Sequence, residues 1–155
     1  MTKRQTKSRA ERIYLSAIRN KAWAKCLIKD AHSGSLRAQH NLGACYATGD
    51  FPTDQDLRKA VFWYRKAASA GDAESQYDLG FMILMGEGLR KDIRLALRWL
   101  EKSAGQGCEQ AQTLLIDLYK NGHYSVRKNP TKVAKWRKLQ TVGSGDASKQ
   151  GEEMT

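Results

Sequence analysis

The residues best suited to chemistry in this sequence are its histidines and cysteines. The histidines are His32, His40 and His123. None of them stands at metal-ligand spacing from another histidine or from a cysteine. The cysteines are Cys26, Cys45 and Cys108. Their odd number and wide spacing, without a CxxC pattern, argue against a disulfide framework and a zinc site. We therefore expect three ordinary buried thiols and no metal site.

Two glycine-containing segments also lack the frame that catalysis requires. Gly86-Glu87-Gly88 follows a helical pattern instead of a strand, and no third glycine stands at the offset of a dinucleotide fingerprint. Ser144 lies between two glycines, but a nucleophile elbow needs a GxSxG frame at a strand-to-helix turn. We therefore expect no catalytic residue, no cofactor and a protein that is not an enzyme.

Positive charge is concentrated at the two ends of the chain, whose formal net charge is +11. Residues 1–29 contribute +8, from nine Lys and Arg against one Glu, and residues 120–155 contribute +5, from eight against three. Residues 30–119 contribute −2, from ten against twelve. A basic end can steer an acidic partner, bind nucleic acid or simply aid solubility, and these alternatives stay open.

Length and composition favour one helical domain. The chain has 155 residues, of which 41% are hydrophobic and 28% charged, with only two prolines. No stretch approaches the roughly 20 apolar residues that cross a bilayer. The N-terminal residues lack the apolar block and cleavage site of a secretory signal. We expect a cytoplasmic protein without a membrane span.

One period of 36 to 37 residues dominates when the sequence is compared with itself. The columns of this repeat are Gly34, Gly71 and Gly107; Gln39, Gln76 and Gln112; Leu42, Leu79 and Leu115; Tyr46, Ile83 and Tyr119; Gly49, Gly86 and Gly122; Ala60, Ala96 and Val133; and Trp63, Trp99 and Trp136. Seven aligned columns indicate three copies of one structural unit.

Each unit is predicted to form two helices joined by a loop. The first helices are expected at 36–48, 73–85 and 109–121, where apolar residues recur at helical spacing. The second helices should follow the N-caps Asp56, Asp92 and Asn129, with Pro130 in the first turn of the last one. Gly71 and Gly107 should end the preceding helices in a left-handed conformation.

Glycines inside the first helices predict how the two helices of a unit pack. Gly43 and Gly80 each cost about 1 kcal/mol relative to alanine, which suggests that a neighbouring helix approaches their backbone. The third unit has Ile116 at this position, so its helices should pack further apart. The tryptophan column is expected to lie in the core.

The segment AESQYDLGFMILMGEGLRKDIRLALRWLEKSAGQG at 73–107 resembles the Sel-one-like repeat family, a branch of the tetratricopeptide-like solenoids. Residues 36–71 are similar to the same repeat, and 108–139 look like a diverged third copy. The resemblance implies an adaptor or scaffold that presents a concave, helix-lined surface to partner proteins. Small bacterial members of the family look like immunity proteins paired with toxins. Extracellular relatives linked to β-lactam chemistry carry helix-bridging cysteine pairs, which this chain lacks.

We therefore predict an all-α fold: a right-handed α/α solenoid of about three helix-turn-helix repeats with an N-terminal capping helix. The expected divisions are a basic flank at 1–9, a repeat domain at 10–142 and a disordered tail at 143–155. Within the domain we expect a cap helix at 10–33 and repeats at 35–71, 72–107 and 108–142. The basic cap helix can equally serve as an arm for an anionic membrane or nucleic acid.

If the first helices line the concave face, as the resemblance implies, repeat two presents an unusual stripe there. Tyr77, Phe81 and Met85 fall at i, i+4 and i+8, and such residues are favoured as interface hot spots. The alternative is that they pack against repeat one. His40, Asp78 and Asp117 are further outward-facing positions. The predicted partner-binding residues are Tyr77, Phe81, Met85, His40, Asp78 and Asp117.

These observations favour a non-catalytic module that binds a partner protein, either an acidic one or a toxin. One alternative is a bacterial immunity protein that neutralises a cognate toxin. Another is nucleic-acid binding through the basic ends.

Overall fold

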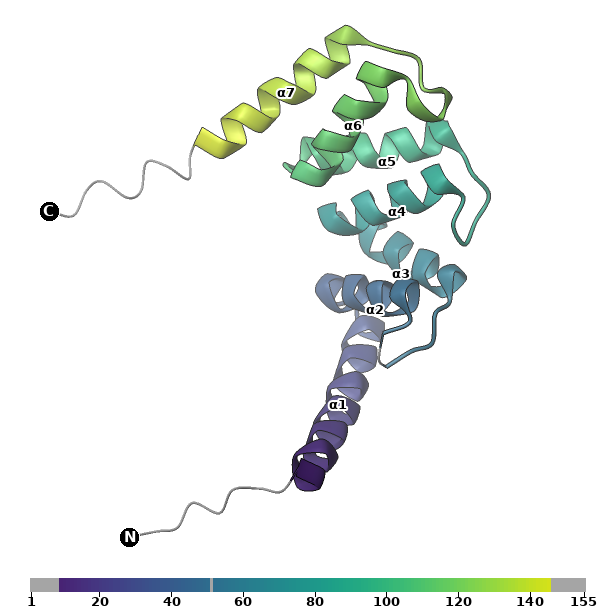
Figure 1. Ribbon diagram of the computed structural model, residues 1–155, viewed down its shortest axis with the longest axis vertical. Coiled ribbons are helices and arrows are strands. Elements are labelled where there is room, and N and C mark those ends of the chain that lie inside the picture. Colours follow the sequence, from purple (N-terminus) through teal and green to yellow (C-terminus); the bar gives the residue numbers. More distant parts are fainter. Residues whose placement is uncertain (1–8, 51, 146–155) are drawn as a thin grey trace, which may run out of the picture.

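Seven α-helices stacked one after another make up the computed structural model, which describes residues 9–50 and 52–145 and the side chains of 21–50 and 52–141 (Figure 1). The elements are α1 Arg9–His32, α2 Leu36–Thr48, α3 Leu57–Ser69, α4 Ala73–Met85, α5 Ile93–Gly105, α6 Glu109–Asn121, the 3-10 turn η1 His123–Ser125, and α7 Pro130–Gly145. This part of the chain contains no strand. The predicted all-α solenoid is confirmed.

The local capping signals define the helices as predicted. Helices α2, α4 and α6 begin and end at the predicted residues. The Asp56 carboxylate accepts hydrogen bonds from the amides of Arg58 and Lys59, and the Asp92 carboxylate accepts one from the amide of Leu95. These bonds satisfy amides that a helix start otherwise leaves without a partner.

In each repeat, the end of the loop between the two helices is hydrogen-bonded to the first helix. The amides of Asp56, Asp92 and Asn129 donate to the carbonyls of Tyr46, Ile83 and Tyr119 at 2.8, 3.4 and 2.9 Å. The three loops consequently lie along one edge of the stack, on the right-hand side of Figure 1. We call this the loop edge; it comprises residues 50, 52–56, 86–92 and 122–129.

Glycines allow the helices of repeats one and two to cross closely, as expected. A Cβ at Gly43 would lie 2.8 Å from Cδ1 of Tyr64, and one at Gly80 would lie 2.9 Å from Cγ of Leu100. Tyr64 and Leu100 are both buried. Their counterpart in repeat three, Arg137, is exposed. Repeat three therefore lacks this contact between a helical glycine and a large buried side chain, and the wider packing expected from Ile116 stays a prediction.

The glutamine column joins each repeat to the helix before it. The side-chain amides of Gln39, Gln76 and Gln112 donate to the carbonyls of Ala31, Ala68 and Ala104 at 3.0, 3.1 and 3.0 Å. Ala31 belongs to α1, so the end of α1 takes the place that the second helix of a repeat takes elsewhere. The last turns of α1 pack accordingly, with Leu27 and Ala31 in one buried cluster with Leu42 and Trp63. These turns cap repeat one.

The tryptophan column is not buried uniformly. Trp63 and Trp136 are only 6% and 2% exposed. Trp99 is partly buried against the main core, and the ammonium of Lys102 lies 4.7 Å from the centroid of its ring. The prediction of a buried column is therefore wrong for Trp99, although a lysine ammonium lies near the ring of all three tryptophans.

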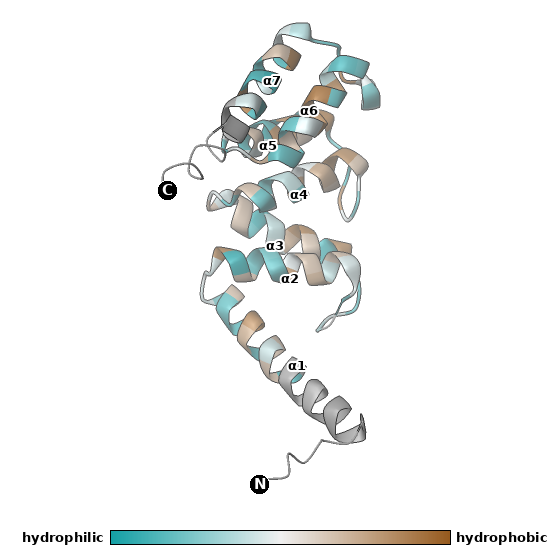
Figure 2. Ribbon diagram, turned by 60° about the vertical axis from the view of Figure 1, so that its left-hand side comes forward, coloured by the Kyte–Doolittle hydropathy of each residue, from teal (hydrophilic) through white to brown (hydrophobic). Residues whose placement is uncertain are grey.

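The expectation of three buried thiols is also wrong. Cys26 is exposed, and Cys45 and Cys108 are partly buried. Cys26 is exposed because this part of α1 buries another face, that of Ala24, Leu27 and Ala31. Hydrophobic residues nevertheless gather where helices meet, and polar ones lie toward the outside (Figure 2).

The last helix is longer than predicted. Helix α7 continues to Gly145, three residues into the segment expected to be a disordered tail. Residues 1–8 of the expected basic flank and 146–155 of that tail lie outside the described residues. No helix in the described ranges is both long enough and apolar enough to span a bilayer.

Candidate partner-binding site

Three side chains on α4 form the apolar part of the candidate site. Tyr77, Phe81 and Met85 are all partly exposed. The ring centroids of Tyr77 and Phe81 lie 6.3 Å apart with a tilt of 33°, within the range of a favourable aromatic pair. Tyr77 also packs against the main core. We call Tyr77, Phe81 and Met85 the α4 strip.

The α4 strip is exposed because α4 buries its other sides. Leu79, Met82, Ile83 and Leu84 on this helix are at most 4% exposed. They belong to the main core, and α4 contacts the second helices of repeats one and two, α3 and α5. The strip therefore follows the one side of α4 that its neighbours leave partly open. Tyr77 also contacts the main core, so part of its surface is used in packing.

A histidine–carboxylate pair across two repeats lies beside the strip. Nε2 of His40 on α2 lies 2.9 Å from Oδ2 of Asp78 on α4, and Nδ1 of His40 lies 3.9 Å from Glu74. The ring of His40 also lies 5.7 Å from that of Tyr64. The hydrogen bond to Asp78 raises the pKa of His40 above its ordinary value of 6.5, although partial burial acts against it.

The surface is hollowed around this pair. A hollow of about 290 Å³ is lined by His40, Glu74, Tyr77, Asp78, Cys108 and Gln110. A second hollow of about 530 Å³ shares His40 and Glu74 with it and continues over Arg37 and Asn41 of α2. The two hollows join repeats one, two and three at the N-terminal ends of their first helices. We call this the histidine groove, and the end of the α4 strip at Tyr77 lies in it.

The structure brings three of the six predicted residues into this groove, namely His40, Tyr77 and Asp78. Phe81 adjoins them through its ring contact with Tyr77, and Met85 follows one turn further along α4. Asp117 is engaged elsewhere. It accepts hydrogen bonds from Asn121 at 2.6 Å and His123 at 2.8 Å, and the His123 bond lowers its pKa.

Among the residues that line the smaller hollow, sequence reasoning missed Glu74, Cys108 and Gln110. Glu74 precedes Asp78 by four residues and so shares its helix face. Gln110 stands in the same repeat column as Arg37 and Glu74, two residues before the glutamine column. This spacing was a usable signal. Cys108 was not predictable in this way, because it is the N-cap of α6 and its neighbours depend on how repeats two and three stack.

The groove offers recognition chemistry: an aromatic and thioether strip, a histidine-carboxylate pair and further carboxylates. Among the described residues, no cluster of three or more His, Cys, Asp or Glu is placed to hold a metal ion. Fold and surface together define a helical repeat protein of the solenoid class.

Within this class, the family is shown by its repeat. A family model of the Sel1 repeat matches residues 36–72, 73–108 and 110–136. These matches span more than half of the chain, and the chain belongs to the Sel1 repeat family. The predicted resemblance is confirmed.

Solved structures of Sel1 repeat proteins are similar to this chain. A Sel1 repeat protein from Oxalobacter formigenes is 30% identical with a TM-score of 0.71, covering 78% of this chain and 48% of its own. A protective antigen of uropathogenic Escherichia coli is 34% identical with a TM-score of 0.70, covering 80% of this chain and 26% of its own.

Curated relatives include much larger proteins. The DAP3-binding cell death enhancer 1 of Rattus norvegicus is 35% identical over 62% of this chain and 18% of its own length. The chitin synthase regulatory factor 3 of Schizosaccharomyces pombe is 32% identical over 66% of this chain and 11% of its own length. The chain thus spans less than a fifth of the length of these two relatives.

Proposed function

We propose that this chain is a non-catalytic protein-interaction module that holds a segment of a partner protein along the α4 strip and the histidine groove. The observation that carries the proposal is the partial exposure of Tyr77, Phe81 and Met85 on a helix whose other sides are buried. Aromatic residues and methionine at a protein surface are typical of interface hot spots.

The charged part of the groove adds specificity to this proposal. His40 and Asp78 form their pair across two repeats, with Glu74 close by. A partner segment that contributes an apolar side chain to Phe81 and a donor to Asp78 or Glu74 satisfies both parts of the surface. The names of the relatives, a DAP3-binding protein and chitin synthase regulators, are consistent with an adaptor role.

The test compares a phenylalanine substitution in the α4 strip with a control substitution of a phenylalanine outside it, both in the full chain. Phe81→Ala removes the central residue of the α4 strip, and Phe62→Ala removes a phenylalanine of α3 that is 59% exposed. Each variant is used as bait, and captured proteins are quantified by mass spectrometry and then titrated. We expect Phe81→Ala to weaken partner binding by about 2 kcal/mol, roughly thirtyfold, as hot-spot truncation does.

Phe62→Ala should leave binding unchanged, and both variants should melt close to the parent protein. A Phe81→Ala protein that binds normally but melts far lower would assign Phe81 to packing. Equal binding losses in both variants would place the partner elsewhere. A toxin-like protein among the captured partners would specify the immunity role.

A further inference from the structure

The third repeat carries a concentration of positive charge that the α4 strip does not use. Between Asp117 and Asp146 the sequence has seven Lys and Arg and no Asp or Glu. Repeat two adds Arg90, Lys91 and Arg94 from the loop edge and the start of α5. The structure brings these two sets of side chains together.

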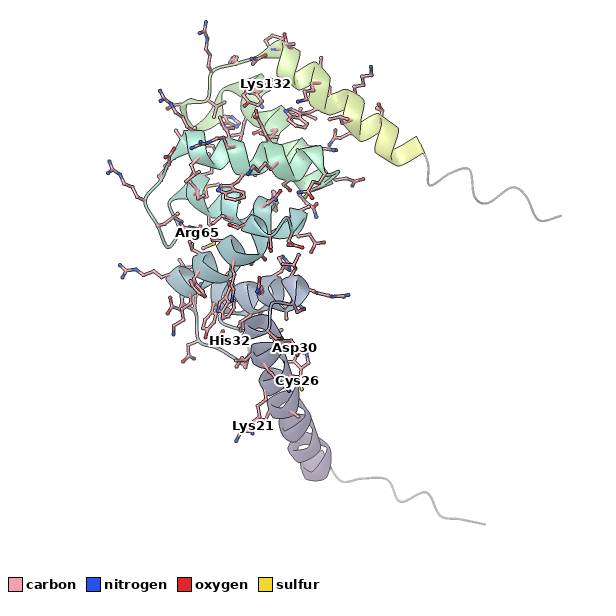
Figure 3. The ribbon with its side chains drawn as sticks, turned by 180° about the vertical axis from the view of Figure 1, so that it is seen from behind. Lys21, Cys26, Asp30, His32, Arg65 and Lys132 are labelled. Carbon is pink, nitrogen blue, oxygen red and sulfur yellow. The ribbon has the colours of Figure 1, made fainter. Side chains whose placement is uncertain are left out.

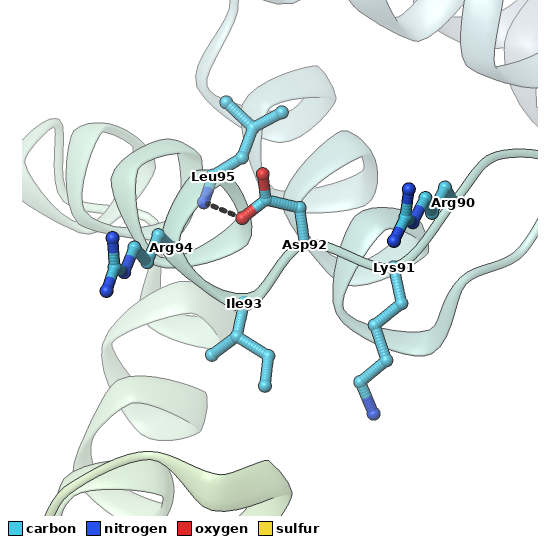
Figure 4. Close-up of a pocket in the computed structure, with 6 residues that line it drawn as sticks. All are labelled: Arg90, Lys91, Asp92, Ile93, Arg94 and Leu95. Carbon is cyan, nitrogen blue, oxygen red and sulfur yellow. Dashed lines mark hydrogen bonds between the residues drawn. The ribbon is translucent and has the colours of Figure 1, made fainter.

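Three hollows along the loop edge share lining residues. The first, about 710 Å³, is formed by residues 90–95, with Arg94 on one side of Asp92 and Arg90 and Lys91 on the other (Figure 4). The second, about 650 Å³, shares Ile93 and Arg94 with the first and extends over Arg127, Lys128 and Lys132.

The third hollow, about 340 Å³, shares Tyr119, Lys128 and Pro130 with the second and ends at Lys120 and Arg137. The three therefore form one depression that runs from repeat two to the outer end of repeat three. We call it the basic channel, and its cations are Arg90, Lys91, Arg94, Lys120, Arg127, Lys128, Lys132 and Arg137.

Most of this charge is not neutralised by the protein. Lys132 pairs with Glu101 at 2.6 Å, but none of the other seven cations has a carboxylate within ion-pair distance in the described part of the chain. Asp92 is the single acidic residue lining the channel, and its carboxylate caps α5. The channel therefore attracts an anionic ligand.

The floor of the channel is aliphatic. Val126 and Val133 are buried beneath it, and Ile93 and Leu97 line it while packing against the core. Single-stranded nucleic acids are commonly held by aromatic side chains on which bases stack. Tyr119 is the aromatic residue that lines the hollows, and the ammonium of Lys132 lies 4.7 Å from the centroid of its ring. Aliphatic floor and cationic rim together fit a peptide better than a nucleic acid.

We infer that the basic channel is a second interaction surface, and that it binds an acidic peptide segment with aliphatic side chains. Glutamate or aspartate of the segment pairs with the arginines and lysines of the rim, and leucine-like side chains contact the floor. This surface lies on the loop edge and shares no residue with the α4 strip or the histidine groove. It does not depend on the function proposed above.

The test measures binding of a fluorescein-labelled peptide of Glu-Glu-Leu repeats to the full chain by fluorescence anisotropy at two ionic strengths. The channel variant combines Arg94→Glu, Arg127→Glu and Lys128→Glu. The matched control combines Lys21→Glu, Lys25→Glu and Arg65→Glu, which changes net charge equally at exposed residues outside the channel. Lys21 and Arg65 lie well away from Lys132 (Figure 3). Melting curves establish that each variant is folded.

We expect the channel variant to bind the peptide about tenfold or more weakly, with reduced salt dependence, and the control to bind like the parent protein. If the triple channel variant does not fold, Arg127→Glu against Lys25→Glu repeats the comparison with single substitutions. Phe81→Ala should leave this affinity unchanged, which separates the channel from the α4 strip.

Four results would overturn the inference. The first would be that the parent protein does not bind the peptide, and the second that both triple variants lose affinity equally. The third would be that a peptide of Glu-Glu-Ser repeats binds as tightly, because the floor would then have no role. The fourth would be that a labelled oligo-dT of equal charge binds more tightly and displaces the peptide, which would make the channel a nucleic-acid surface.

Discussion

Repeats one and two share a packing arrangement that repeat three has lost. In the first two, a glycine of the first helix lies against a large buried side chain of the second, Tyr64 or Leu100. Repeat three has Ile116 and Arg137 at these positions, and Arg137 is exposed. We call the glycine contact between the two helices of repeat one or two a closed seam. The corresponding place in repeat three, at Ile116 and Arg137, lacks this contact, and we call it the open seam.

A polar network holds repeat three where the close crossing is missing. Lys132 of α7 donates to Glu101 of α5 at 2.6 Å, and Tyr119 of α6 donates to the same oxygen at 2.7 Å. Burial opposes ionisation of Glu101, but these hydrogen bonds outweigh it and lower its pKa. The comparison teaches that partly exposed polar contacts add to the core packing of the terminal repeat, and that its open seam forms part of the basic channel.

The largest expected effect tests whether α7 is anchored in spite of this open seam. Trp136→Ala should lower the free energy of unfolding by about 3–5 kcal/mol, because the side chain is 2% exposed. Trp99→Ala, at the same position of repeat two, should cost about 1–2 kcal/mol less, because Trp99 is only partly buried. Urea unfolding of both variants measures the difference. Equal losses would mean that the two tryptophans are covered alike.

The second prediction compares the two seams directly. Leu100→Ala should cost about 2–5 kcal/mol, because this side chain is fully buried against Gly80. Arg137→Ala, at the same repeat position, should change stability by less than about 0.5 kcal/mol. Melting temperatures rank the two variants. A strongly destabilised Arg137→Ala protein would show that the third seam is closed after all.

The third prediction uses two helical glycines with opposite surroundings. In Gly80→Ala the new methyl group would meet Leu100, including its backbone nitrogen at 3.2 Å, so a loss of about 1–2 kcal/mol is expected after the gain in helix propensity. Gly105→Ala has nothing within 4 Å of the new Cβ and should stabilise the protein by up to about 1 kcal/mol. Thermal unfolding measures both. A neutral Gly80→Ala would contradict the close crossing.

The helices were predictable because two independent signals agree in this sequence. The period aligns equivalent residues of the three repeats, and the N-caps Asp56, Asp92 and Asn129 mark where each second helix begins. The positive φ of 104° at Gly71 and 93° at Gly107 likewise follows from glycine just after the last helical turn. These features depend on residues close in the sequence, so local physical chemistry determines them.

The degree of burial was not predictable from the same pattern. The repeat column correctly places Trp63, Trp99 and Trp136 on one helix face, but the neighbours that cover each ring differ between repeats. The His40–Asp78 pair shows the same limit for the site. Both residues were predicted to face outward, but the bond between them depends on how α2 and α4 stack. Whether the α4 strip and Asp117 bind a partner stays a prediction.

The smallest expected effect concerns this cross-repeat pair in the closed part of the molecule. Because the pKa of His40 is raised in the folded protein, folding favours its protonated form. The stabilisation is therefore fully present below the unfolded pKa of about 6.5 and is lost as pH rises through the folded pKa. The side chains of His40 and Asp78 are 20% and 30% exposed, so we expect at most about 1 kcal/mol.

Melting curves of the parent protein and of His40→Gln between about pH 6 and pH 8 measure this contribution. The parent protein should lose stability relative to His40→Gln as pH rises, by about 2–4 °C for each kcal/mol. Asp78→Asn should remove the same pH dependence, because it removes the carboxylate that favours the imidazolium. If His40→Gln and the parent protein keep a constant difference across this range, the hydrogen bond does not favour protonated His40. The contact between repeats one and two would then rest on apolar packing and on the hydrogen bond that the Gln76 side chain donates to the Ala68 carbonyl.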